Sequence, residues 1–131
     1  MALSAPRGAD ARAASLHASV TFLSMNDKVH LLSEGAKVTE LWGRVTPARF
    51  NDYEVHVNRI EGEYVWHAHA DTDDVLMVLS GRLIVQLRDR EVQLGPGEMF
   101  VVPAGVEHRP VAPEETVIMC IEPAGTAPSG D

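Results

Sequence analysis

The feature that most constrains the fold of this chain is an alternation of polar and apolar residues with a period of two. In residues 52–58 the alternation places Tyr53, Val55 and Val57 on one face of an extended segment. Other short segments rich in β-branched and aliphatic side chains are residues 74–79, 82–88, 99–102 and 115–121. Turn-forming pairs with glycine or proline separate them at spacings of roughly eight to twelve residues, which is typical of an antiparallel sandwich or barrel. The sequence therefore predicts an all-β fold.

The two ends of the chain lack this pattern. Residues 1–19 contain no aromatic residue, and Leu3 and Leu16 are their large aliphatic side chains. Such a segment buries too little apolar surface to offset the entropy of ordering it, so we expect a flexible tail. We expect a second flexible tail at residues 124–131 and one β-barrel domain at residues 20–123. Within that domain, residues 21–32 could form either a helix or an edge strand.

Charge and composition exclude several classes of partner. The formal net charge is −8, and the 11 lysines and arginines form no run of five, so we expect no nucleic-acid partner. No apolar run is longer than that at residues 75–79, which is too short to cross a bilayer, so we expect no membrane contact. The single cysteine, Cys120, has apolar neighbours and is interpreted as a buried side chain. With no apolar signal segment at the N-terminus, these features predict a cytoplasmic protein.

Three histidines and an aspartate have the spacing of a metal site. His67 and His69 would point to the same face of a strand, with their Cα atoms about 6.5–7 Å apart. From that separation two imidazoles can reach one ion at about 2.0–2.1 Å. Asp74 follows at a distance where a turn would return it beside His69, and His108 follows the turn at residues 103–105. We therefore predict one divalent ion bound by His67, His69, Asp74 and His108.

The other histidines have no such context. His17 lies in the expected tail and His30 in an edge segment, so both are interpreted as solvated side chains. His56 lies on the polar face of its strand and is either exposed or part of a pocket. Three imidazoles and one carboxylate suit Zn, Fe(II), Mn or Ni and leave positions open for water or substrate. The ligand set does not choose among these metals.

Two stretches resemble the two sequence motifs of the cupin family. Residues 62–81 read Gly, four residues, His-Ala-His, four residues, Asp, six residues and Gly. Residues 97–108 read Gly, five residues, Pro-Ala-Gly, two residues and His. The resemblance spans about residues 45–123 and is strongest to small single-domain bacterial cupins labelled mannose-6-phosphate-isomerase-like. It implies a jelly roll, a double-stranded β-barrel, with one metal ion inside.

The chain departs from the cupin pattern at three points. The first motif has four residues rather than five between Gly62 and His67. The usual glutamate is Asp74, which is one methylene shorter, so the ion must lie nearer its strand or be reached through water. The asparagine that often ends the second motif is replaced by Ala112. Asp74 is therefore where we expect this site to deviate.

The resemblance implies a metal-dependent enzyme, either an isomerase or lyase or a dioxygenase, acting on a small polar or carboxylated metabolite. Two alternatives stay open: a sensor that binds a small ligand without catalysis, and a metal that only stabilises the barrel. An isomerase or lyase needs a general acid or base, and the candidates are Glu54, His56, Tyr64 and Glu98. Lysine and arginine do not cluster in the motif strands, so the sequence gives little support for a sugar-phosphate substrate.

We also expect a homodimer. Cupins of this size commonly pair through an N-terminal strand, which would lie here within residues 20–45. The edge strands of an open barrel need covering, and a second copy can supply the cover.

Overall fold

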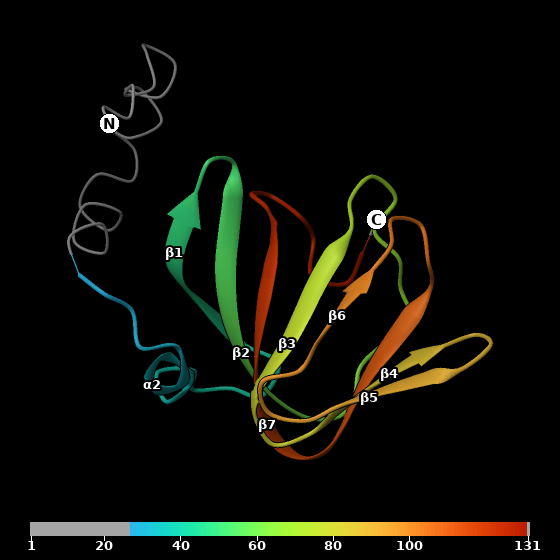
Figure 1. Ribbon diagram of the computed structural model, residues 1–131, viewed down its shortest axis with the longest axis horizontal. Helices are drawn as coiled ribbons and strands as arrows, with labels where there is room; N and C mark the ends of the chain where they lie inside the picture. Colours follow the sequence, from blue (N-terminus) through green and yellow to red (C-terminus); the bar gives the residue numbers. More distant parts are fainter. Residues whose placement is uncertain (1–26, 131) are drawn as a thin grey trace.

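The computed structural model describes residues 27–130, which form one short helix and seven antiparallel strands (Figure 1). The elements are α2 (Leu31–Gly35), β1 (Arg44–Phe50), β2 (Tyr53–Glu63), β3 (Asp74–Ser80), β4 (Leu83–Leu87), β5 (Glu91–Leu94), β6 (Met99–Val102) and β7 (His108–Pro123). The all-β prediction is confirmed. The tail predicted at residues 1–19 lies outside the described residues, as does the first half, residues 21–26, of the segment for which helix and strand were both open. The described half forms no strand, and its last two residues begin α2. No helix in the described part of the chain is long and apolar enough to cross a membrane.

The longest strand, β7, connects the two walls of the barrel. Its residues 108–111 pair with β4, residues 111–112 and 116–123 pair with β2, and residues 117–121 also pair with β3 on the other side. The sheet order is β1-β2-β7-β3-β6, and the β4–β5 hairpin attaches to the start of β7 (Figure 1). Because β7 runs from one wall to the other, it carries His108 at one end and Glu122 near the other end.

Strand register decides which side chains face the barrel interior. His56, Cys120, Leu76 and Phe100 are cross-strand partners, so they share one face. That face is the inner one, because Leu76 belongs to the buried core and Cys120 and Phe100 pack against it. His56 is 2% exposed, whereas Tyr53 on the opposite face is 43% exposed. The face of β2 that carries Tyr53 is therefore the outer face, which an alternation of period two cannot reveal by itself.

The outer face of the sheet is also apolar. Two rows of cross-strand partners line it, namely Val55, Ile121, Val75 and Val101, and then Val57, Met119, Met77 and Met99. Helix α2 packs onto part of this face, where Gly35 lies so close to Val117 that a Cβ would be 2.8 Å from its Cγ1. Val57 is 0% exposed, but Met99 is 52% and Val101 is 40% exposed. A single chain thus leaves part of this apolar face uncovered.

Candidate metal centre

The two histidines of the first motif lie on the segment that joins β2 to β3. The prediction of a strand here is wrong, because the segment forms a single isolated bridge, between His67 and His108. The His67 N–H donates to the His108 carbonyl at 3.0 Å, and the His108 N–H donates to the His67 carbonyl at 2.9 Å. The next carbonyl in line, that of His69, accepts a hydrogen bond from Gly105 N–H at 2.8 Å. Regular strand pairing therefore does not extend beyond this bridge toward His69, but the bridge holds His67 and His108, one histidine from each motif, side by side.

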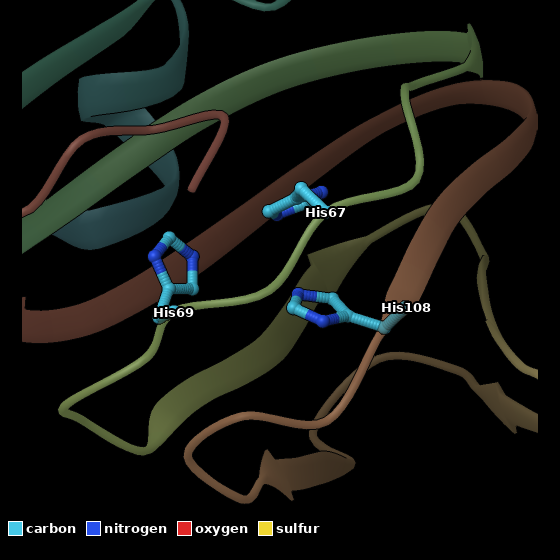
Figure 2. Close-up of side chains that lie close together, drawn as sticks. All are labelled: His67, His69 and His108. Atoms are coloured by element: carbon cyan, nitrogen blue, oxygen red, sulfur yellow. The ribbon is translucent and has the colours of Figure 1, made fainter. Parts of the chain in front are cut away.

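The three histidines of the motifs converge. Figure 2 shows His67 and His69 on the joining segment and His108 at the start of β7, with the three rings turned toward a shared space. One ligand atom from each ring lies within 4.8 Å of those from the other two. The ring centroids of His67 and His108 are 4.2 Å apart, and those of His67 and His69 are 5.2 Å apart. All three side chains are at most 9% exposed. The predicted grouping of the histidines is thus present in the fold.

Backbone hydrogen bonds set the imidazole tautomers of two of these histidines. Nδ1 of His67 donates to the Val65 carbonyl at 2.9 Å, and Nδ1 of His108 donates to the Val106 carbonyl at 3.0 Å. Because a carbonyl only accepts, each Nδ1 carries the proton and each Nε2 keeps its lone pair. Nε2 of His108 is buried and has no hydrogen-bond partner among the described residues. The buried, unpartnered Nε2 of His108 fits a metal ion, and the backbone hydrogen bonds to Nδ1 of both histidines are typical of metal-binding histidines.

Burial also keeps His108 neutral. Burial, together with the charges of the nearby His67 and His69, lowers the pKa of His108 to about 4, against the opposing effect of the hydrogen bond to Val106. A neutral imidazole is the form that binds a metal. At neutral pH the site therefore needs no deprotonation at His108 before an ion binds.

The fourth predicted residue, Asp74, lies beside His69 at the start of β3. Its Oδ2 is 3.5 Å from Nε2 of His69, so the expected proximity is present. Its carboxylate forms a second group with His69 and Glu122, whose ligand atoms all lie within 4.8 Å of one another. Burial, and then the charge and hydrogen bond of Glu122, raise the pKa of Asp74 to about 7. The two candidate ligand groups share His69.

Glu122 is the residue of this region that sequence reasoning missed. It is 4% exposed and lies near the end of β7, on the same face as Cys120. The available signal was parity: Ile118, Cys120 and Glu122 alternate along one strand, so a face interpreted as apolar ends in a carboxylate. Parity along one strand could not predict that Glu122 lies beside Asp74, because the two residues are far apart in the sequence.

A cavity adjoins these residues, with about 550 Å³ of empty space when the open solvent at its mouth is included. Its walls are largely apolar, and its polar lining comes from Arg44, Asn58, Tyr64 and the metal-centre residues. The rings of Trp42 and Tyr64 stack at 4.8 Å, and the Tyr64 ring meets His67 edge-on at 5.4 Å. Residues 124–130, for which a flexible tail is predicted, pass beside this cavity, and Pro128 lines it. Their flexibility stays a prediction.

The four candidates for a general acid or base lie in different places. Tyr64 lines the cavity. Glu98 lies at the β5–β6 turn, where its Oε1 accepts a hydrogen bond from Gly95 N–H at 2.7 Å. Glu54 forms an ion pair with Arg49 at 2.7 Å. Of the four, Tyr64 is therefore the one placed to meet a molecule in the cavity.

The fourth candidate, His56, is buried in a polar network with Glu122, which lines the cavity. Its Nδ1 lies 2.8 Å from Thr46 Oγ1, and its Nε2 lies 3.4 Å from Glu54 Oε1 and 3.5 Å from Glu122 Oε1. Burial, followed by the positive charge of Arg44, lowers the pKa of His56 to about 4. His56 is thus neither a solvated nor a cavity-lining histidine, but a neutral side chain that packs against Glu122.

The lowered pKa of His56 predicts acid sensitivity of the metal-free protein. The unfolded chain takes up this proton near pH 6.5 and the folded chain near pH 4, so stability is lost as the pH falls between these values. His56→Gln should reduce that loss by about 3 kcal/mol relative to wild type. Urea unfolding in a chelating buffer at pH 7 and pH 4 measures the difference. Equal losses in the two proteins would show that His56 does not carry the effect.

Comparison with known proteins decides the family. A sequence profile described as the cupin domain matches residues 53–122, which is more than half of the chain. The chain belongs to the cupin family. The barrel of this cupin is the jelly roll that its two motifs implied. A crystal structure of a cupin-2 domain protein from Shewanella frigidimarina superimposes with a TM-score of 0.72 at 41% identity, covering 76% of this cupin and 97% of that chain.

Two relatives at the sequence level complete the comparison. This cupin is 31% identical to the protein YdbB of Bacillus subtilis over 99 residues, which are 75% of this cupin and 88% of YdbB. It is 29% identical to 3-hydroxyanthranilate 3,4-dioxygenase 2 of Aspergillus fumigatus over 91 residues. That match covers 65% of this cupin but 47% of the dioxygenase, so this cupin spans about half of the fungal protein.

Proposed function

We propose that this cupin is a metal-dependent enzyme of the dioxygenase type that acts on a small polar or carboxylated molecule inside the barrel. The observation that carries the proposal is the convergence of three buried histidines, His67, His69 and His108, beside an open cavity. Asp74 would add a carboxylate to this set. Fe(II) is the ion that suits this reaction, and Zn, Mn and Ni are the alternatives that the ligands also accept.

The walls of the cavity favour oxygen chemistry over the alternatives. Ile60, Leu76 and Ile118 provide an apolar lining beside the histidines, which would limit the water around a bound ion and substrate. An iron ion bound there would supply redox chemistry toward O₂ at its open positions. The similarity to a fungal dioxygenase over 91 residues supports the same choice.

The protein's own polar groups would orient the substrate. Tyr64 lines the cavity, and its ring is held between Trp42 and His67. Oδ1 of Asn58 is buried and has no hydrogen-bond partner among the described residues, so it can accept from a substrate hydroxyl or amine. These groups would fix which end of the molecule approaches the metal ion.

An isomerase or lyase is the second candidate, and the position of Tyr64 favours it. The Tyr64 hydroxyl could exchange a proton with a substrate polarised by the ion. A sugar phosphate is a poor match for either reaction. Among the described residues that line the cavity, Arg44 is the single lysine or arginine, and it forms an ion pair with Glu122 at 3.2 Å.

Oxygen uptake tests the dioxygenase proposal. Protein purified without chelators or a nickel column is analysed for metals, loaded with Fe(II) and mixed with 3-hydroxyanthranilate and a panel of catechols and aminophenols in an oxygen electrode. We expect O₂ uptake that matches substrate loss in the wild type and is absent in His67→Ala. Product without O₂ uptake would favour the isomerase or lyase, and thermal stabilisation without product would favour a ligand sensor. If the metal stabilises the protein but none of these molecules binds, the ion has a structural role.

We also propose that two copies of this cupin pair, and that they do so in the cytoplasm, as the single cysteine suggests. The apolar outer face of the sheet supports the pairing, since Met99 and Val101 are 52% and 40% exposed in the single chain. Sedimentation equilibrium at micromolar concentration checks it: a dimer is expected for the wild type, and Val101→Glu should shift it to a monomer.

A further inference from the structure

Three carboxylates lie in a row across the interior face of the sheet. Glu54 on β2 pairs directly with Glu122 on β7. On the other side of β7, Val75 pairs with Ile121, so the next step of the antiparallel ladder places Asp74 opposite Glu122. Side chains directly opposite each other have Cβ atoms about 4.5–5.5 Å apart, and like charges in such positions repel. The row of Glu54, Glu122 and Asp74 therefore needs positive charge to be stable in its ionised form.

Two of the three carboxylates in this row have an arginine partner in the described part of the chain, and the third does not. Glu54 accepts from Arg49 at 2.7 Å, and Glu122 accepts from Arg44 at 3.2 Å. Asp74 has no lysine or arginine partner among the described residues, and its nearest basic group is His69 at 3.5 Å. Oδ1 of Asp74 is buried, and no described residue forms a hydrogen bond with it. The charge deficit is thus confined to the end of the row that borders the three histidines.

Burial makes this deficit costly. Asp74 is 6% and Glu122 is 4% exposed, so water does little to screen the two carboxylates from each other. Their ligand atoms and that of His69 all lie within 4.8 Å of one another. A divalent cation at this position would neutralise both carboxylates and occupy the orphaned oxygen of Asp74.

The length of the side chains points to the same arrangement. Asp74 is one methylene shorter than a glutamate, so its carboxylate extends less far from its strand. Glu122 has the longer side chain and approaches the same space from the neighbouring strand β7. Glu122, which lies outside both sequence motifs, can therefore place a carboxylate where the shorter side chain of Asp74 does not extend.

We propose that Glu122 is a ligand of the metal ion, and that it forms with Asp74 the carboxylate half of the centre whose other half is His67, His69 and His108. The inference rests on the proposed function, because it concerns the same ion. It predicts that the carboxylate ligation of this cupin is divided between β3 and β7.

Cobalt binding to the full chain tests this role of Glu122. Co²⁺ is titrated into metal-free wild type, Glu122→Gln and Asp74→Asn, with affinity measured by calorimetry and coordination by visible absorption. Glu54→Gln is the matched control, because Glu54 belongs to the same row but is not part of either ligand group. We expect Glu122→Gln to weaken Co²⁺ affinity by at least about 100-fold and to change the absorption spectrum, while the control stays within about threefold and keeps the wild-type spectrum.

A second variant of Glu122 distinguishes loss of a metal ligand from misfolding. Glu122→Asp keeps the charge that Arg44 needs but shortens the side chain, so it should fold like the wild type by circular dichroism and still lose most of the Co²⁺ affinity. A wild-type spectrum in Glu122→Gln would overturn the inference, whether or not affinity falls, because Glu122 would then act only through Asp74. If wild type binds no Co²⁺, or His67→Ala binds it equally well, the proposed function fails instead.

Discussion

His108→Ala is expected to abolish the stabilisation of the protein by Zn²⁺. In the wild type, Zn²⁺ at about 100 times its dissociation constant should raise the free energy of unfolding by about 2.7 kcal/mol. The ligand atom is the buried Nε2 of His108, whose tautomer is set by the 3.0 Å hydrogen bond from Nδ1 to Val106. Alanine has no atom that reaches the ion, so the gain should fall to near zero. Urea unfolding with and without Zn²⁺ measures it.

A second histidine provides the matched control. His30 is exposed and caps α2, with its Nδ1 2.9 Å from Ser33 Oγ. His30→Ala should cost about 0.5–1 kcal/mol of cap stability but keep the full Zn²⁺-dependent gain. If His108→Ala keeps the gain as well, the ion is bound elsewhere and the metal centre described above is wrong.

Gly81→Ala is expected to destabilise the fold by about 3 kcal/mol or more. Gly81 has a φ of +88°, and a Cβ there would collide with Thr116 Oγ1 and lie 2.8 Å from both the Glu115 carbonyl oxygen and the Thr116 Cα. Thr116 cannot retreat, because it is 0% exposed and its hydroxyl donates to the Arg82 carbonyl and accepts from the Arg82 N–H, each at 3.0 Å. Urea unfolding of the metal-free protein measures the loss.

Gly97→Ala separates this close contact from backbone strain. Gly97 has a comparable φ of +83°, but a Cβ at this position would meet no heavy atom within 4 Å. The expected cost is therefore that of the left-handed backbone alone, about 1–2 kcal/mol. Equal losses in the two variants would show that the contact with Thr116 relaxes and that only the backbone conformation matters.

Local sequence was sufficient for the fold class and for the three histidines. A period of two follows from the geometry of one strand, and the spacing of turn residues sets strand length, so neither depends on distant parts of the chain. The convergence of His67, His69 and His108 could be predicted because two compact motifs contain them. The error at His67 and His69 concerned their backbone, which forms one bridge to His108 in place of a strand.

The tertiary structure decided which strand face points inward and which residues meet there. The register of β2, β7 and β3 buries His56 and brings Glu54, Glu122 and Asp74 into one row, although Asp74 and Glu122 are far apart in the sequence. No local pattern encodes such a pairing, because it arises from hydrogen bonds between strands that close the barrel. The amino-acid sequence by itself thus determined an all-β chain with three convergent histidines. Only the packed barrel determined which carboxylates lie beside them, because cross-strand register is a property of the whole sheet.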